Sequence, residues 1–233
     1  EGSAFVNEPV TESDLTTSRS MIFVSPDGER SINTYLGIST DLGPADVPVG
    51  VASSAQIMFL EGYLFDKPAG KESFRTAARL TREGGGMAGI AISDPFCVDR
   101  HRDDFLQLIG NELDYVIGNE AEILSLFQTE DLEHALENTA AMCPLVVCTR
   151  SGDGVTAIRG GERVDVPVTP ITPVDATGAG DQFAAGLLYG IATGKDLDVC
   201  AKMGNLCAGE VISHVGPRPQ IDMIEEFKNA GLV

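Results

Sequence analysis

Basic side chains are scarce in this sequence. Its 233 residues include 16 Lys and Arg against 35 Asp and Glu, which gives a formal net charge of −19 at pH 7. Such a charge repels a phosphate backbone, so nucleic acid is excluded as an expected partner. Long apolar runs are lacking as well: none approaches the ~20 residues that span a bilayer, and no membrane partner is expected.

Cysteine is sparse and tryptophan is absent. The cysteines are scattered, odd in number and never spaced C-x-x-C, at Cys97, Cys143, Cys148, Cys200 and Cys207. Disulfide frameworks and zinc sites need paired or clustered cysteines, so the pattern predicts reduced core thiols and a cytoplasmic, reducing compartment. With 43% apolar and 22% charged residues, the composition is that of an ordinary globular protein.

Strand-like and helix-like segments alternate along most of the chain. A β-hairpin is predicted first, from MIFV and RSINTYL on either side of the turn Ser25-Pro26-Asp27-Gly28. Further strands are expected at 57–61, 89–93, 115–118, 145–149, 155–158 and 163–168, and helices at 70–83, 101–110, 120–127, 131–142, 181–193, 197–213 and 220–229. This alternation indicates one α/β domain over residues 1–233, with a parallel sheet and helices on both faces.

The most informative stretch is Asp175-Ala176-Thr177-Gly178-Ala179-Gly180-Asp181. An apolar helix follows it, with one face formed by Phe183, Ala184, Leu187, Leu188 and Ile191. The glycines are therefore expected at the first helical turn, where unpaired N–H groups and the helix dipole attract anions. Asp181 at that edge could take a proton from a hydroxyl group that attacks a phosphate. The alternative is a plain turn in which Asp181 only complements the dipole.

This run, followed by the pattern x-F-x-A-G, resembles the signature of the ribokinase-like (PfkB) carbohydrate and nucleoside kinases. The resemblance implies a three-layer α/β/α fold with a mostly parallel central sheet, plus the remnant of a small β lid at about 20–36. It also implies an ATP-dependent enzyme that phosphorylates a primary hydroxyl of a nucleoside or sugar. Gly178, Ala179 and Gly180 would form the anion hole for the γ-phosphate, and Asp181 would be the catalytic base.

Asn119-Glu120-Ala121-Glu122 resembles the family's N-x-x-E motif. The resemblance implies that Asn119 and Glu122 organise Mg²⁺ and phosphate through water. The same four positions also fit a helix cap, with Asn at the N-cap and Glu three residues later. Both interpretations stay open at this point.

Thr149-Arg150-Ser151-Gly152-Asp153-Gly154 follows an apolar strand and resembles the family's nucleotide loop, T-x-G-x-x-G. The resemblance assigns ATP contacts to Thr149, Ser151, Gly152 and Gly154. Ser151 replaces a usual glycine and accepts a positive φ poorly. A plain strand-to-hairpin turn is the alternative.

Two segments near the end of the chain, GNLCAG and SHVG, resemble those that flank the family's adenine pocket. Asn205 and Gly216 are the nucleotide contacts that the resemblance assigns there. His214 is expected to pack or to cap a helix instead of taking part in catalysis.

Several family members bind K⁺ beside the anion hole, through the first Asp of the motif and neighbouring carbonyl groups. Asp175 occupies that position and Thr177 could offer its carbonyl oxygen, so the resemblance allows K⁺ as a cofactor beside ATP and Mg²⁺. Alternatively, Asp175 hydrogen-bonds nearby backbone groups and only stabilises the turn.

The segments SRSMIFVSPDGERSINTYLG, FLEGYLFD and SDPFCVDRH most resemble the bacterial-type adenosine kinase-like members of the family. Such members carry a Gly-Gly substrate motif and most of the β lid in an N-terminal part that this chain is expected to lack. Adenosine, ribose and fructose stay open as small-molecule acceptors, a homodimer is allowed, and a sugar kinase or a non-catalytic scaffold is the alternative. A nucleotide-binding dehydrogenase is excluded, because no G-x-G-x-x-G opens a helix after an early strand.

Overall fold

A six-stranded sheet forms the centre of the computed structural model, which describes residues 14–233; residues 1–13 of the expected domain lie outside the described part. The strands lie in chain order, and the first four are parallel, whereas the last two are antiparallel to their neighbours. They are β3 (Ile57–Glu61), β4 (Met87–Ala91), β5 (Tyr115–Asn119), β6 (Leu145–Thr149), β7 (Val155–Arg159) and β8 (Glu162–Val166). The sheet is therefore mostly parallel, as predicted.

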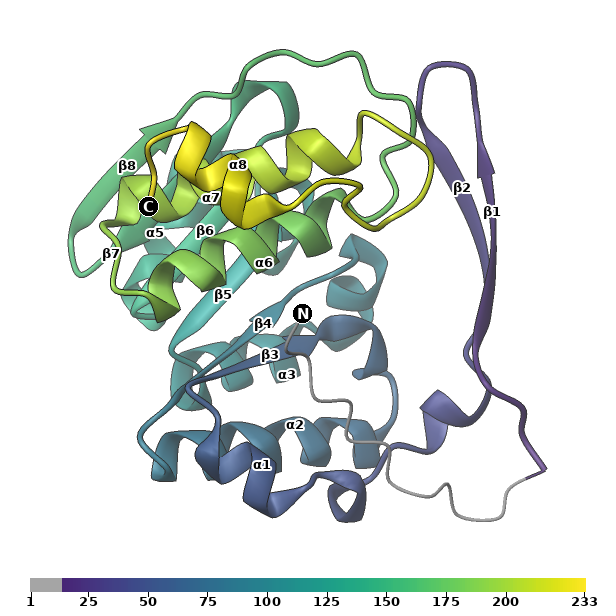
Figure 1. The fold of residues 1–233 in the computed structure, drawn as a ribbon. Helices are drawn as coiled ribbons and strands as arrows, with labels where there is room; N and C mark the ends of the chain where they lie inside the picture. Colours follow the sequence, from purple (N-terminus) through teal and green to yellow (C-terminus); the bar gives the residue numbers. More distant parts are fainter. Residues whose placement is uncertain (1–13) are drawn as a thin grey trace.

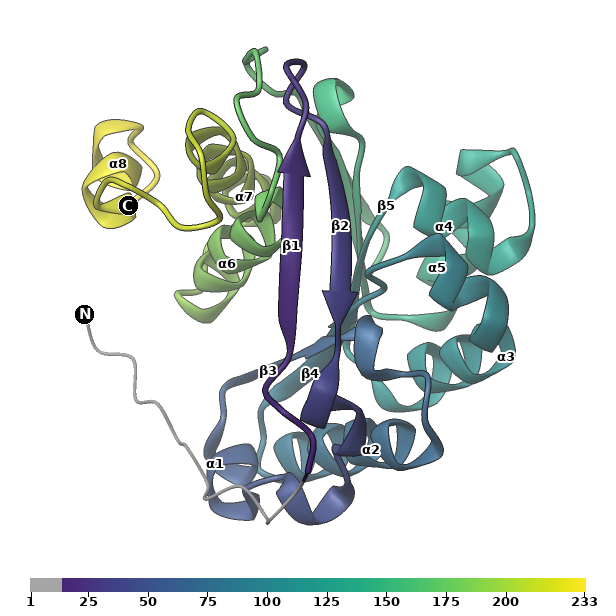
Figure 2. The ribbon, with the colours of Figure 1, turned by 90° about the vertical axis from the view of Figure 1, so that its right-hand side faces the viewer.

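Helices cover both faces of this sheet, which Figure 2 shows nearly edge-on between them. One face carries α2 (Pro68–Glu83), α3 (Pro95–Glu112), α4 (Glu120–Phe127) and α5 (Leu132–Met142), with α1 (Val49–Ser54) packed beside α2. The other face carries α6 (Ala179–Ala192) and α7 (Leu197–Val211), with α8 (Met223–Asn229) outside them. The predicted three-layer α/β/α fold is confirmed.

The inner strands bury side chains on both faces, which explains their nearly continuous apolar runs. In β6, Val146 belongs to the core under α2–α5, and Val147 belongs to the core under α6 and α7. The same alternation separates Val116 from Ile117 in β5. Because two cores hold the sheet from both sides, the loops at the strand ends start from fixed positions.

A second, two-stranded sheet stands beside this body (Figure 1). It is the expected hairpin, formed by β1 (Arg19–Val24) and β2 (Arg30–Tyr35), and every residue of both strands is exposed. In its turn, the Gly28 N–H donates to the Ser25 carbonyl at 2.9 Å. The Gly28 carbonyl accepts a 3.1 Å hydrogen bond from the Ala176 N–H. The hairpin tip is thus fixed to the segment that leads into α6.

The helix expected at 101–110 begins earlier, because α3 starts at Pro95. Asp94 caps it by accepting a 2.8 Å hydrogen bond from the Phe96 N–H, and proline suits the first helical position. His101 has non-helical φ and ψ values of −131° and 27° within the element. This interruption breaks the apolar periodicity, so the first turns are hidden from a pattern-based prediction.

All five cysteines are free and buried, which agrees with the prediction of core thiols. Burial raises the pKa of both Cys143 and Cys148 to about 12, so neither is a reactive thiolate near neutral pH. Within residues 14–233, no helix is both long enough and apolar enough to cross a membrane.

Candidate active site

Three of the predicted motifs meet where the parallel strands end. Asn119 is the last residue of β5 and lies opposite Thr149, the last residue of β6. Glu61 ends β3, and the charge of Asp181 in α6 contributes to the raised pKa of Glu61. Ligands of open α/β sheets bind in the crevice outside this edge. The carboxyl edge of the sheet and the start of α6 therefore form one candidate site.

The first turn of α6 carries the glycine-rich motif. Gly178 is the N-cap with a left-handed φ of 84°, and Ala179 and Gly180 open the helix. The Ala179 N–H donates to the Ala176 carbonyl at 3.3 Å, whereas the N–H groups of Gly180 and Asp181 have no acceptor among the residues that the structure describes. A Cβ atom at Gly180 would meet nothing within 4 Å. Free donors at a positive helix end thus lie beside open space, as an anion site requires.

Asp181 follows these glycines and is accessible to solvent. Neighbouring protein atoms still desolvate its carboxyl group enough to raise its pKa above the ordinary value, and the positive charge of Arg30 opposes that rise. Arg30 belongs to β2, so the hairpin brings a cation to the start of α6. The sequence pattern did not point to Arg30, because no local motif links a hairpin residue to a helix far along the chain.

Asp175 is only 3% exposed and is fully engaged with the backbone. Its Oδ1 accepts a 2.9 Å hydrogen bond from the Thr177 N–H, and its Oδ2 accepts a 3.0 Å hydrogen bond from the Gly216 N–H. Hydrogen bonds from Thr177 and Gly216 hold its pKa below the ordinary value. These contacts match the turn-stabilising interpretation of Asp175, and K⁺ binding at Asp175 and Thr177 is the untested alternative.

Asn119 and Glu122 form a complete capping box at the start of α4. Asn119 Oδ1 accepts from the Glu122 N–H at 2.9 Å, and the Glu122 carboxylate accepts from the Asn119 N–H and Nδ2 at 2.9 and 2.7 Å. Burial is the largest cause that raises the pKa of Glu122, to about 7. The helix-cap interpretation is therefore realised, and the role in organising Mg²⁺ stays a prediction.

Glu61 lies at the edge of the candidate site, and sequence reasoning missed it. Its Oε2 accepts a 3.1 Å hydrogen bond from Ser93 Oγ, and Ser93 has a strained φ of 75°. Burial and the nearby charge of Asp181 raise the pKa of Glu61 to about 7. A carboxylate at the end of the apolar strand IMFLE was the available signal, because strand ends of parallel sheets gather at one edge.

The predicted nucleotide loop leads from β6 into β7. Ser151 has a φ of 48°, so it does occupy the left-handed conformation in which the family usually has glycine. Gly154 has a φ of 92°, and a Cβ atom there would lie 2.2 Å from the Val166 carbonyl oxygen. Thr149, the last residue of β6, lies opposite Asn119 at the sheet edge, and Ser151, Gly152 and Gly154 follow it in the loop that leaves this edge.

The remaining predicted nucleotide contacts lie on and after α7. Asn205 is part of α7, and its Nδ2 is 3.4 Å from the Pro167 carbonyl oxygen. Gly216 follows α7, and its N–H donates a hydrogen bond to Asp175, the first residue of the anion-hole motif at 175–181. His214 lies against Glu210, with 3.2 Å between Nε2 and Oε1, as expected for a packing residue. The adenine contacts of Asn205 and Gly216 stay predictions.

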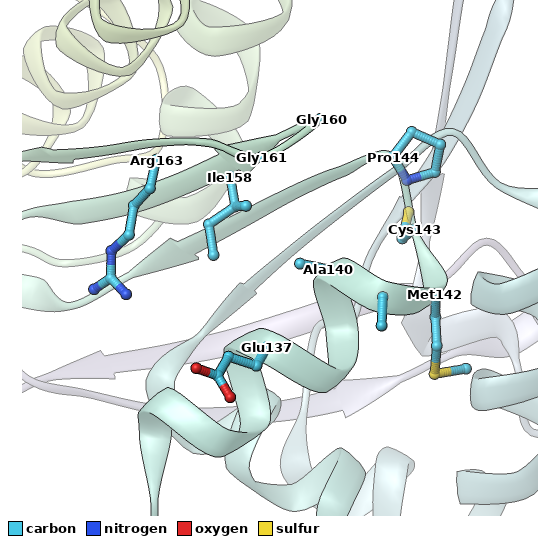
Figure 3. A pocket seen from close by; sticks show the side chains of 10 residues that line it. Glu137, Ala140, Met142, Cys143, Pro144, Ile158, Gly160, Gly161 and Arg163 are labelled. Atoms are coloured by element: carbon cyan, nitrogen blue, oxygen red, sulfur yellow. The ribbon is translucent and has the colours of Figure 1, made fainter.

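A separate surface hollow lies between α5 and the β7–β8 hairpin (Figure 3). Its lining includes Glu137, Met142, Pro144, Ile158 and Arg163. None of the predicted site residues lines it. Its charged groups are the carboxylate of Glu137 in α5 and the guanidinium of Arg163 in β8. This hollow is therefore separate from the candidate site at the sheet edge.

Known proteins resemble this chain over most of its length. An uncharacterised sugar kinase of Archaeoglobus fulgidus is 29% identical over 211 residues, which cover 90% of this chain and 82% of that protein. The crystal structure of a probable sugar kinase from Rhizobium etli is 44% identical, with a TM-score of 0.93. That of adenosine kinase from Sinorhizobium meliloti is 45% identical, with a TM-score of 0.89.

The two solved structures are longer than this chain. The match covers 97% of this chain but 69% of the Rhizobium protein, and 92% of this chain but 66% of the Sinorhizobium protein. Residues 7–223 match the pfkB family carbohydrate kinases. The chain therefore belongs to the pfkB family of carbohydrate kinases.

Proposed function

We propose that the protein transfers the γ-phosphate of ATP to a primary hydroxyl of a nucleoside or sugar, with adenosine as the first acceptor to test. The observation that carries the proposal is the carboxylate of Asp181 in the same helical turn as the free N–H groups of Gly180 and Asp181. Family membership and the 45% identity to an adenosine kinase support it.

The proposal gives each of these residues a role that the geometry supports. The N–H groups of Gly180 and Asp181 would hold the transferred phosphoryl group, because they have no acceptor within residues 14–233 and lie at the positive end of the helix dipole. Asp181 accepts the proton of the acceptor hydroxyl, and its raised pKa makes it a better base than an ordinary aspartate. Arg30 adds positive charge where negative charge develops.

The residues present fit ATP and Mg²⁺. The nucleotide would lie along Thr149, Ser151, Gly152 and Gly154, with Asn205 and Gly216 towards the base. Within residues 14–233, no three His, Cys, Asp or Glu side chains come close enough to hold a metal by themselves. As the resemblance to the N-x-x-E motif implies, the oxygens of Asn119 and Glu122 would act through water, and the bound Mg²⁺ would neutralise phosphate charge.

A sugar acceptor is the second candidate, since two of the similar proteins are described as sugar kinases. The deciding experiment measures ADP formation from Mg·ATP with adenosine, ribose, fructose or no acceptor, beside calorimetric titration with Mg·ATP. We expect nucleotide binding and ADP formation that depends on one acceptor. Absence of both binding and turnover would contradict the proposal and favour a non-catalytic scaffold.

A further inference from the structure

Glu210 is a buried carboxylate in an unfavourable position. It lies in the last turn of α7, where the negative end of the helix dipole repels a carboxylate, and its side chain is only 10% exposed. Its Oε2 is buried and has no hydrogen-bond partner among the residues that the structure describes. Burying a carboxyl group costs stability unless its hydrogen bonds compensate, so the contacts of the other oxygen are of interest.

The other carboxylate oxygen of Glu210 joins the two ends of a loop, residues 212–220. Oε1 accepts a 2.9 Å hydrogen bond from the Gln220 N–H at the far end of the loop. The same oxygen lies 3.2 Å from Nε2 of His214, near the start of the loop. One buried side chain thus closes the 212–220 loop onto α7.

The middle of this loop packs against the anion-hole motif at 175–181 and against the residue after it. The Gly216 N–H donates to Asp175 Oδ2 at 3.0 Å, and Gln182 Nε2 donates to the Pro217 carbonyl at 3.2 Å. Pro217 is so close to Gly178 that a Cβ atom on the glycine would lie 2.7 Å from the proline Cβ. The loop therefore contacts the motif before, at and after its left-handed glycine.

We propose that Glu210, together with His214, is a positioning residue for the anion hole. Glu210 holds the 212–220 loop closed. Gly216 and Pro217 in this loop then keep Asp175 and Gly178 in their observed conformation. In that conformation the N–H groups of Gly180 and Asp181 are available to phosphate. This inference rests on the proposed phosphoryl transfer. It assigns Glu210 no contact with substrate.

The test compares Glu210→Ala and Glu210→Gln, with Asp198→Ala as the matched control on the exposed first turn of the same helix. Glu210→Ala should lower kcat by about tenfold or more while KM for ATP changes much less, because the anion hole acts chiefly in the transition state. Glu210→Gln keeps an oxygen for the Gln220 N–H and should restore most of kcat. Asp198→Ala should match wild type.

Hydrogen exchange read by mass spectrometry supplies the second readout. Amides of 212–220 and 178–182 should exchange faster in Glu210→Ala than in wild type or Glu210→Gln.

An unchanged kcat in folded Glu210→Ala, or an equal loss of kcat in Glu210→Gln, overturns the inference. If Glu210→Ala does not fold, His214→Ala decides by the same two criteria. If wild type transfers phosphate to no acceptor, the proposed function fails, and the exchange at 178–182 alone decides whether Glu210 positions the motif.

Discussion

Glu61 is held in an environment that disfavours its charge. Its pKa of about 7 in the folded protein lies above its usual value of 4.5, so stability is lost as pH rises between these values. Glu61→Gln removes that penalty and can still accept from Ser93. At pH 8 we predict that the unfolding free energy of Glu61→Gln exceeds that of wild type by about 1 kcal/mol, after allowing for partial exposure, so that its Tm is higher. At pH 4 the two Tm values should be equal.

Thermal unfolding at the two pH values checks this, with the exposed Glu162→Gln as control. Equal melting of wild type and Glu61→Gln at pH 8 would show that the site solvates Glu61 well.

Asp175 leads to a prediction about monovalent cations. Both of its oxygens already accept backbone N–H groups, and these bonds fix the turn before α6 without a cation. We therefore predict the same turnover in K⁺ and in a non-binding organic cation at equal ionic strength. A rate that depends on K⁺ would instead assign Asp175 and the Thr177 carbonyl to a cation site.

Individual site residues differ in how far sequence reveals them. Gly178, Gly180 and Asp181 are neighbours in the chain and share one helical turn, so a local pattern was sufficient to predict where they lie. Arg30 and Glu61 come from the hairpin and from β3, and only the tertiary fold brings their charges near Asp181. Their places could not be predicted from spacing along the chain.

The start of α4 combines a helix cap with a predicted metal motif, and one substitution separates the two roles. Asn119→Ser keeps an oxygen for the Glu122 N–H but removes the side-chain amide. We predict that the unfolding free energy falls by no more than about 1 kcal/mol, whereas kcat falls at least about tenfold. Urea unfolding and steady-state kinetics provide the measurements. Full activity in Asn119→Ser, with losses only in Asn119→Ala, would mean that the motif is a cap alone.

Among the elements, the buried strands were the most predictable. Ile57–Glu61 and Leu145–Thr149 coincide with the predicted strands, because apolar runs bounded by polar turns leave little freedom. No helix was predicted at Val49–Ser54, since a six-residue helix next to prolines has almost no periodicity. The kink at His101 likewise hid the first turns of α3.

At the scale of the whole molecule, the hairpin connects distant parts of the site. Its tip is bonded to Ala176, and Arg30 lowers the pKa of Asp181. Arg30→Gln should therefore raise that pKa, and the acidic limb of the kcat/KM profile should move to higher pH, because the base must be deprotonated. Arg19→Gln, on the other strand and stacked over Tyr35, is the control. A limb that stays in place in Arg30→Gln would remove Arg30 from the site.

The central claim is that Asp181 is the base of a phosphoryl transfer, and Asp181→Asn tests it most directly. The substitution removes a partly desolvated charge, so the fold should melt no lower than wild type. With the acceptor identified in the screen, kcat should fall by about a thousandfold while calorimetric binding of Mg·ATP is kept. The exposed Asp103→Asn on α3 should behave as wild type. A kcat in Asp181→Asn close to that of wild type would contradict the account.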